Sequence, residues 1–121
     1  MIQCLSVGIG GFFGSIMRYL IGLIPVKDKT VFPIQTLFIN VLGAFLIGVI
    51  ISLFAKHTDW DENVMLMLKV GFCGGFTTFS TFSSEALKLM ESGNRAAGIL
   101  YILLSVLLGI AAVYCGQHAV R

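Results

Sequence analysis

Four long apolar stretches constrain this chain more than any other feature of its sequence. They cover residues 2–24, 34–55, 64–90 and 96–117, and short polar segments separate them. An α-helix needs about 20 apolar residues to cross the hydrocarbon core of a bilayer, whereas membrane strands of about ten residues would show alternation. We therefore predict an all-α integral membrane protein in which residues 1–121 form a single transmembrane domain of four helices.

The composition excludes a water-soluble monomer and a nucleic-acid partner. Hydrophobic residues make up 57% of the chain and charged residues only 12%, whereas a soluble domain carries about a quarter charged residues. The formal net charge is +2, so the chain has no basic field that could hold nucleic acid. We expect its surroundings to be the lipid bilayer of the cell membrane.

The distribution of basic residues only weakly predicts the orientation of the chain in the membrane. Short links make sequential helices antiparallel neighbours, so the two termini and the link 56–63 share one side of the membrane. That side carries Lys56 and Arg121, and the other carries Lys27, Lys29 and Arg95. Under the positive-inside rule this difference is small. The chain therefore either slightly prefers one orientation or inserts in both.

Small residues recur at helical spacing along three of the predicted helices. Because lipid is as apolar as the side chains, membrane helices associate mainly through close packing of small residues. These small and partly polar stripes predict tight packing around a shared interior. They comprise Gly10, Gly14 and Arg18 in the first helix, Thr36, Asn40, Gly43 and Gly48 in the second, and Gly98, Tyr101, Ser105, Gly109, Ala112 and Gly116 in the fourth.

Asn40 lies in the middle of a charge-free apolar stretch. An unsatisfied amide in hydrocarbon costs several kcal/mol by rough estimate, so this side chain must face either a hydrogen-bond partner or a water-filled path. An asparagine at such a position either joins helices through hydrogen bonds or serves function directly. The residue alone leaves both interpretations open.

The third apolar stretch contains a run that cannot face lipid on all sides. From Thr77 to Ser84, six of the eight residues carry hydroxyl groups, and the other two are Phe79 and Phe82. Glycines at 74 and 75 precede this run, a pattern typical of a broken membrane helix, and broken backbone at membrane depth is buried or lines a cavity. We therefore predict that the third helix is broken near residues 74–78.

A break in a helix exposes backbone groups that can bind either a cation or an anion. The carbonyl groups that it frees suit a cation, and the N–H groups suit an anion. Phe79 and Phe82 are spaced i, i+3 and lie on one face of the half-helix beyond the break. Their positive ring edges could contact an anion without a formal charge, although phenylalanines at helical spacing usually fill a core.

These motifs together resemble the small fluoride-channel family, Fluc, also called CrcB. The specific part is the run Gly71-Phe-Cys-Gly-Gly-Phe-Thr-Thr-Phe-Ser-Thr-Phe-Ser-Ser-Glu85. The first helix adds the pattern Gly10-Gly-x-x-Gly14-x-x-x-Arg18-Tyr, and the second adds threonine at 36, asparagine at 40 and glycines at 43 and 48. The resemblance extends over essentially the whole chain in length, helix number and motif order.

The resemblance implies a bacterial plasma-membrane channel that exports fluoride from the cytoplasm by passive conduction. It implies an antiparallel, dual-topology homodimer with two fluoride pathways at the subunit interface. By the match, Asn40 donates its amide to fluoride, and Phe79 and Phe82 present their ring edges. The same match places hydroxyl groups along a polar track at Thr36, Ser80, Thr81, Tyr101 and Ser105.

Three further assignments follow from the resemblance. The broken helix would offer backbone carbonyls of Gly74 and Thr77, from both subunits, to a structural sodium ion at the dimer interface. Arg18 would make the aqueous entrance attractive to anions, and Glu85 would lie near the path. Lys69 is outside these motifs, and we interpret it as an interfacial anchor whose long stem reaches the membrane surface.

Other classes fit the sequence less well. Small four-helix multidrug or cation exporters share the length, but they resemble one another in an embedded glutamate in the first helix, where this chain has no acid. A proton-coupled transporter would need a titratable group near the middle of a helix, for which Glu85 is the only candidate, whereas a channel needs none. An enzyme is disfavoured because His57 and His118 lie in a link and at the terminus, and no nucleophile with a base or metal-ligand cluster can be assembled. A purely structural subunit would leave the hydroxyl run unexplained.

Overall fold

The computed structural model describes residues 1–25 and 32–120, and its regular structure over these ranges is helical. Four helical spans are long and apolar enough to cross a membrane: Ile2–Gly22, Ile34–Lys56, Glu62–Glu91 and Arg95–Ala119. Each end lies within two residues of the apolar stretch that predicted it. Lys27, Lys29 and Arg121, which enter the charge comparison, lie outside the described residues.

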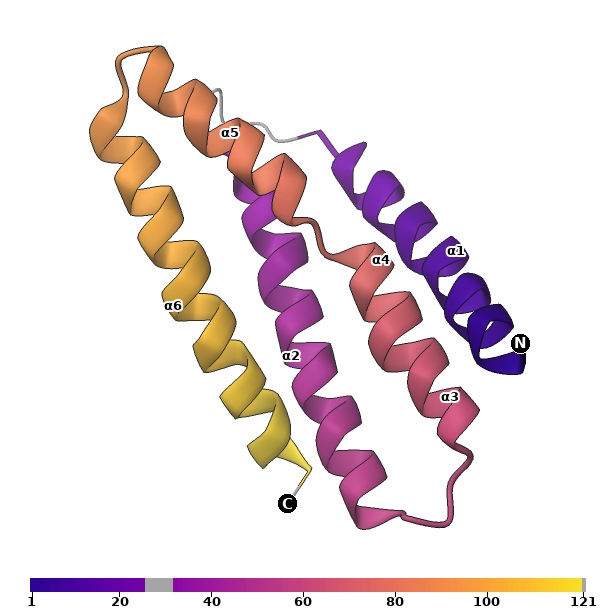
Figure 1. The fold of residues 1–121 in the computed structure, drawn as a ribbon. Coiled ribbons are helices and arrows are strands. Elements are labelled where there is room, and N and C mark those ends of the chain that lie inside the picture. The colour runs from indigo at the N-terminus through magenta and orange to yellow at the C-terminus, as the bar shows by residue number, and fades with distance from the viewer. Residues whose placement is uncertain (26–31, 121) are drawn as a thin grey trace.

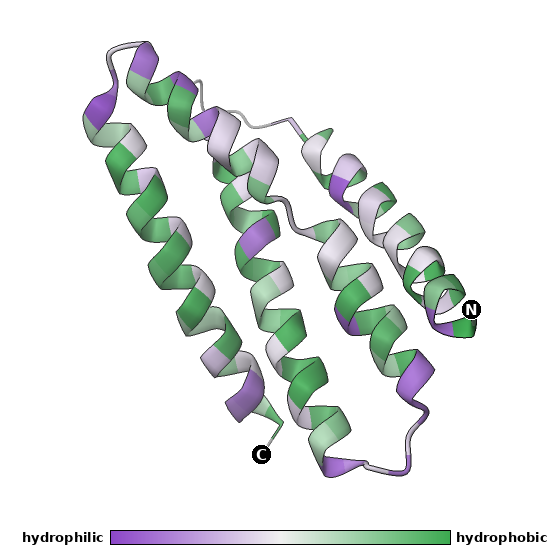
Figure 2. Ribbon diagram, viewed as in Figure 1, coloured by the Kyte–Doolittle hydropathy of each residue, from purple (hydrophilic) through white to green (hydrophobic). Residues whose placement is uncertain are grey.

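Successive spans run in opposite directions, as the short links predict (Figure 1). Helix α1 (Ile2–Gly22) rises in this view, α2 (Ile34–Lys56) descends, the third span rises and α6 (Arg95–Ala119) descends. Figure 2 shows that hydrophobic residues cover these spans and that the links between α2 and α3 and between α5 and α6 are hydrophilic. This distribution is the one that a bilayer requires of a multi-pass protein.

The third span is assembled from several pieces. Helix α3 (Glu62–Leu66) continues into a π-helical segment, η1 (Met67–Cys73), and then into α4 (Gly74–Phe76). Two residues with extended backbone follow, Thr77 at φ −83°, ψ 159° and Thr78 at φ −147°, ψ 115°, before α5 (Phe79–Glu91) begins. The glycines at 74 and 75 are themselves helical, so the two threonines carry the departure from helical geometry.

Local capping explains where the pieces of the third span begin and end. The carboxylate of Asp61 accepts the N–H of Asn63 at 2.9 Å and caps α3, and the hydroxyl of Thr78 accepts the N–H of Thr81 at 3.2 Å and caps α5. Gly93, at φ +89°, ends α5 in the left-handed conformation that glycine adopts without strain. The N–H of the next residue, Asn94, returns to the carbonyl of Leu89 at 2.9 Å.

Glycines bring the spans into backbone contact. A Cβ atom at Gly10 or Gly14 of α1 would collide with backbone atoms of η1, and one at Gly48 or Gly116 would collide with the facing backbone of α6 or α2. The small-residue stripes therefore pack these helices as predicted. Gly109 differs, because a Cβ atom there would meet nothing of this chain within 4 Å.

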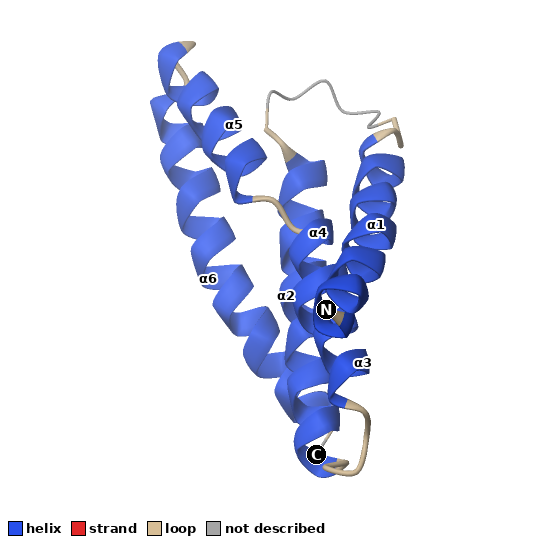
Figure 3. Ribbon diagram, turned by 45° about the vertical axis from the view of Figure 1, so that its right-hand side comes forward, coloured by secondary structure: helices blue, strands red, loops and turns tan. Residues whose placement is uncertain are grey.

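Helix α2 occupies the centre of the arrangement (Figures 1 and 3). Helix α1 packs on η1 and α4, the first half of the third span, whereas α6 packs on α2 and on α5, the second half. The main apolar cluster lies between α5 and α6, around Ala86, Leu89 and the fully buried Tyr101. The two halves of the third span thus have different neighbours, and the extended threonines lie where these neighbours change.

Candidate functional site

An open groove of about 620 Å³ runs between α2, the third span and α6. It begins at the π-helical segment, passes the extended threonines and reaches the first turn of α5. Of the residues that the sequence singled out, it brings together Asn40, Gly74, Thr77, Phe79, Phe82 and Ser105. The groove is therefore where the predicted anion-contacting and cation-contacting groups meet.

The side chain of Asn40 is bonded to the backbone of the interruption. Its Nδ2 donates to the carbonyl of Thr78 at 3.1 Å, and its Oδ1 accepts the N–H of the same residue at 2.8 Å. Both polar groups of the Thr78 backbone are thereby satisfied at membrane depth. Because an amide nitrogen carries two hydrogens, one N–H of Asn40 is still available to another acceptor.

The extended threonines change the hydrogen-bond partners of the carbonyl groups at the end of α4. In a continuous helix the N–H of Thr78 would donate to the carbonyl of Gly74, but here it donates to Asn40. The carbonyl of Cys73 accepts both the N–H and the hydroxyl of Thr77, at 3.0 and 2.8 Å. The carbonyl of Gly74 is thus released from its helical partner at a residue that lines the groove.

Arg18 is bonded to the same end of α4. Its side chain is half-buried, and its Nε donates to the carbonyl of Gly75 at 3.0 Å. A cation at the C-terminal end of a helix is stabilised by the helix dipole and by the carbonyl groups that have lost their partners. This bond uses one of the five N–H groups of the guanidinium, and it explains how a charged residue is accommodated within α1.

The two phenylalanines of α5 have different surroundings. Phe82 is half-buried, with its ring centroid 5.1 Å from that of Tyr101 and 5.8 Å from that of Phe79. Phe79 is 79% exposed although it lies within an apolar span. Packing in the core therefore explains part of the burial of Phe82, but within a single chain Phe79 does not fill a core.

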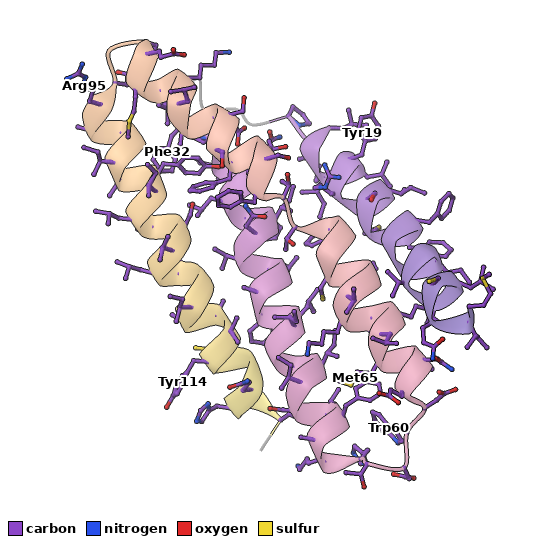
Figure 4. The ribbon with its side chains drawn as sticks, viewed as in Figure 1. Tyr19, Phe32, Trp60, Met65, Arg95 and Tyr114 are labelled. Atoms are coloured by element: carbon purple, nitrogen blue, oxygen red, sulfur yellow. The ribbon has the colours of Figure 1, made fainter. Side chains whose placement is uncertain are left out.

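Tyr101 and Glu85 form a polar pair beside the apolar cluster. The Tyr101 hydroxyl donates to Oε1 of Glu85 at 3.0 Å, and the buried Thr36 lies beside that hydroxyl. Phe32, labelled in Figure 4, packs edge-on against the Tyr101 ring with the centroids 5.5 Å apart. Glu85 opens on a second pocket, of about 190 Å³, beside Lys88. These groups form the wall behind the groove rather than its lining.

Known proteins resemble this chain over nearly all of its length. Residues 5–117 match the model of the family described as "CrcB-like protein, Camphor Resistance (CrcB)". The chain belongs to the CrcB family. A protein of Azobacteroides pseudotrichonymphae is 44% identical over 111 residues, which are 91% of this chain and 89% of that protein. Proteins of Rhizobium johnstonii and Gloeothece citriformis are 44% and 38% identical, each covering 100% of this chain and 98% of its own length. All three are named fluoride-specific ion channel FluC.

The resemblance seen in the sequence motifs is thus confirmed, and the CrcB motifs can be placed in the structure. Ser80 and Thr81 are exposed in the first turn of α5. The Oγ of Ser105 is buried, and among residues 1–25 and 32–120 it has no hydrogen-bond partner. A buried hydroxyl without a partner is uncommon, so Ser105 is the groove hydroxyl that most needs a polar ligand.

Sequence reasoning missed two residues of this candidate site. Thr78 supplies the extended backbone that pairs with Asn40, and its place in the hydroxyl run was the available signal. Lys69 lines the groove, on η1, whereas the sequence led us to expect a lysine that reaches the membrane surface. A lysine one helical turn before the glycine-rich motif was the signal for its position.

Proposed function

We propose that this chain is a fluoride channel of the cell membrane, which exports fluoride from the cytoplasm by passive conduction. The observation that carries the proposal is the groove, where three groups lie around the extended threonines: an amide with a spare N–H, a hydroxyl without a partner in the described part of the chain, and an exposed aromatic ring. The relatives named as fluoride-specific channels cover the full chain, and conduction rather than enzymatic turnover is the function of such proteins.

The chemistry of the groove suits a small and strongly hydrated anion. Fluoride gives up water only where several donors converge, and conduction requires that each contact be weak. Asn40 offers one N–H, and Ser105 offers a hydroxyl without a partner among the described residues. The rings of Phe79 and Phe82 add positive edges. We place Ser80, Thr81, Thr36 and Tyr101 along the same track, with Glu85 near it.

We further propose that the channel is an antiparallel homodimer with two pathways. A single copy leaves Phe79 79% exposed and the groove open, so one chain does not enclose a path. Gly74 and Gly109 have open space where a Cβ would stand, which leaves room for a close neighbour. The small difference in basic residues between the two sides fits insertion in both orientations.

We also propose that a structural sodium ion binds between the two copies at the interrupted helices. The residues present fit this ion, because the released carbonyl of Gly74 and the neighbouring Thr77 line the groove and carbonyl oxygens are ligands of hard cations. Gly74 also lacks a side chain that would separate the two copies. The bound ion would supply positive charge at the C-terminal ends of the α4 helices.

Flux from reconstituted vesicles tests the proposed function. Vesicles loaded with fluoride should release it when the protein is present and no proton gradient is applied, whereas vesicles loaded with chloride should not. Equal chloride release would contradict the selectivity, and fluoride release that requires a proton gradient would contradict a channel. A cation exporter is not favoured, since α1 contains no acidic residue and the relatives are named as channels.

A further inference from the structure

Lys69 is the charged side chain of the groove. It lies on η1 inside the third span, seven residues after the span begins at Glu62, and it is half-buried. It lines the groove together with Ile47 and Val113, which are apolar, and with the polar Asn40 and Ser105. An ammonium group in the wall of a membrane groove needs water or an anion to compensate its charge.

Among the residues that the structure describes, none is bonded to this ammonium. Within residues 1–25 and 32–120, the lysine and arginine side chains that donate hydrogen bonds are those of Arg18 and Lys56, and Lys69 forms neither a hydrogen bond nor an ion pair. Glu85, the acidic residue in the interior of the third span, is bonded to Tyr101 and opens on the other pocket. The electric field of the Lys69 ammonium therefore acts on any ion that occupies the groove.

The position of Lys69 along the groove separates it from the contacts proposed for the ion. Thr77 lies eight residues further along the chain, which corresponds to about 12 Å along the helix axis. It lies toward the link between α2 and α3, because the third span rises from that link (Figure 1). The main-chain positions of Lys69 and Thr77 are thus well separated along the groove, and the field of the ammonium reaches an ion held at Asn40 wherever salt does not screen it.

We infer that Lys69 is an anion-attracting residue at the entrance of the groove on the side of the α2–α3 link. This inference rests on the proposed fluoride conduction and adds to it a residue that sets the rate of entry. Lining groups of one sign in a low-dielectric cleft raise the local concentration of the opposite ion. In an antiparallel pair, each side of the membrane would carry one such lysine.

Fluoride flux at two ionic strengths tests the inference. The screening length is about 30 Å at 0.01 M salt and about 3 Å at 1 M, so the field of Lys69 spans the groove only in the first condition. We expect Lys69→Met to lower the fluoride flux by about threefold to tenfold at 0.01 M and to match the unmodified protein at 1 M. Lys69→Arg should keep the flux, and Lys69→Gln replaces the methionine variant if that does not fold.

Lys56→Met is the matched control, because this exposed lysine ends α2 on the same side of the membrane but is not part of the groove lining. It should leave the flux unchanged. Equal flux of Lys69→Met and the unmodified protein at 0.01 M would overturn the inference and leave the proposed function intact. A loss that is equal at both ionic strengths would also overturn it, since packing alone would explain that loss. Absence of fluoride flux from the unmodified protein would instead refute the proposed function.

Discussion

At the scale of single residues, Asn40 joins the helix interruption to α2. Its position in a charge-free stretch predicted that it needs a partner, but the partner is 38 residues away in the sequence and could not be named in advance. The same holds for Arg18, whose bond to the Gly75 carbonyl depends on how α1 packs against the third span. Sequence thus identified the polar residues that need partners, whereas tertiary packing selected those partners.

Replacing Asn40 by aspartate tests its double role. A carboxylate keeps the acceptor for the Thr78 N–H but loses the donor to the Thr78 carbonyl, which costs about 1–3 kcal/mol when that carbonyl is left unpaired. It also places a negative charge where an anion must pass. We expect Asn40→Asp to abolish fluoride flux nearly completely and to lower the unfolding temperature. The control is Asn94→Asp in the exposed link between α5 and α6, which should change neither measurement.

Phe79 should affect conduction more than folding. Its ring is 79% exposed in the single chain, so replacing it with isoleucine removes little of the buried core. An aromatic edge contact contributes about 0.5–1.5 kcal/mol, and its loss should slow fluoride flux by roughly 2-fold to 10-fold while the unfolding temperature stays the same. Phe12→Ile on α1, 62% exposed and outside the groove lining, should leave the flux unchanged. Unchanged flux in Phe79→Ile as well would contradict the ring-edge role.

At the scale of helices, the spans were predictable because their length is set by the thickness of the bilayer. The π-helical register of η1 was not predictable, since it shows no periodicity of its own and lies where glycines of α1 contact the backbone. The glycines at 74 and 75 led us to expect a break, but both are helical, and the extended backbone lies at Thr77 and Thr78, where Thr78 pairs with Asn40. Local sequence therefore did not specify which residues are extended, because that depends on a partner in another helix.

The contact between α1 and the third span should depend on Gly14. A Cβ atom at this position would collide with the carbonyl of Phe72, and backbone cannot move aside as a side chain can. We expect Gly14→Ala to lower the free energy of unfolding in detergent by about 1–3 kcal/mol, measured by circular dichroism. Gly8→Ala on the same helix meets nothing within 4 Å and should be neutral or slightly stabilising, by up to about 1 kcal/mol. Equal effects of the two variants would argue against this packing role.

At the scale of the whole molecule, a single chain leaves its groove open. This groove carries polar groups, a cation and an exposed aromatic ring on a face that lipid would cover poorly, and the proposed second copy would cover that face. In the sequence, the weak charge bias indicated that a second copy could insert in the opposite orientation. The number of copies and their relative placement depend on contacts between chains, and no pattern within one sequence specifies them.

Labelling in intact bacterial cells tests the antiparallel arrangement. With Cys4 and Cys115 replaced by serine and the buried Cys73 kept, a cysteine at Asp59 or at Asn94 reports on links at opposite ends of the spans. If the chain inserts in both orientations, a membrane-impermeant maleimide should label about half of the copies of each variant. A single orientation predicts full labelling of one variant and none of the other, and that result would exclude an antiparallel pair. Permeabilised cells provide the control, because both variants should then be labelled completely.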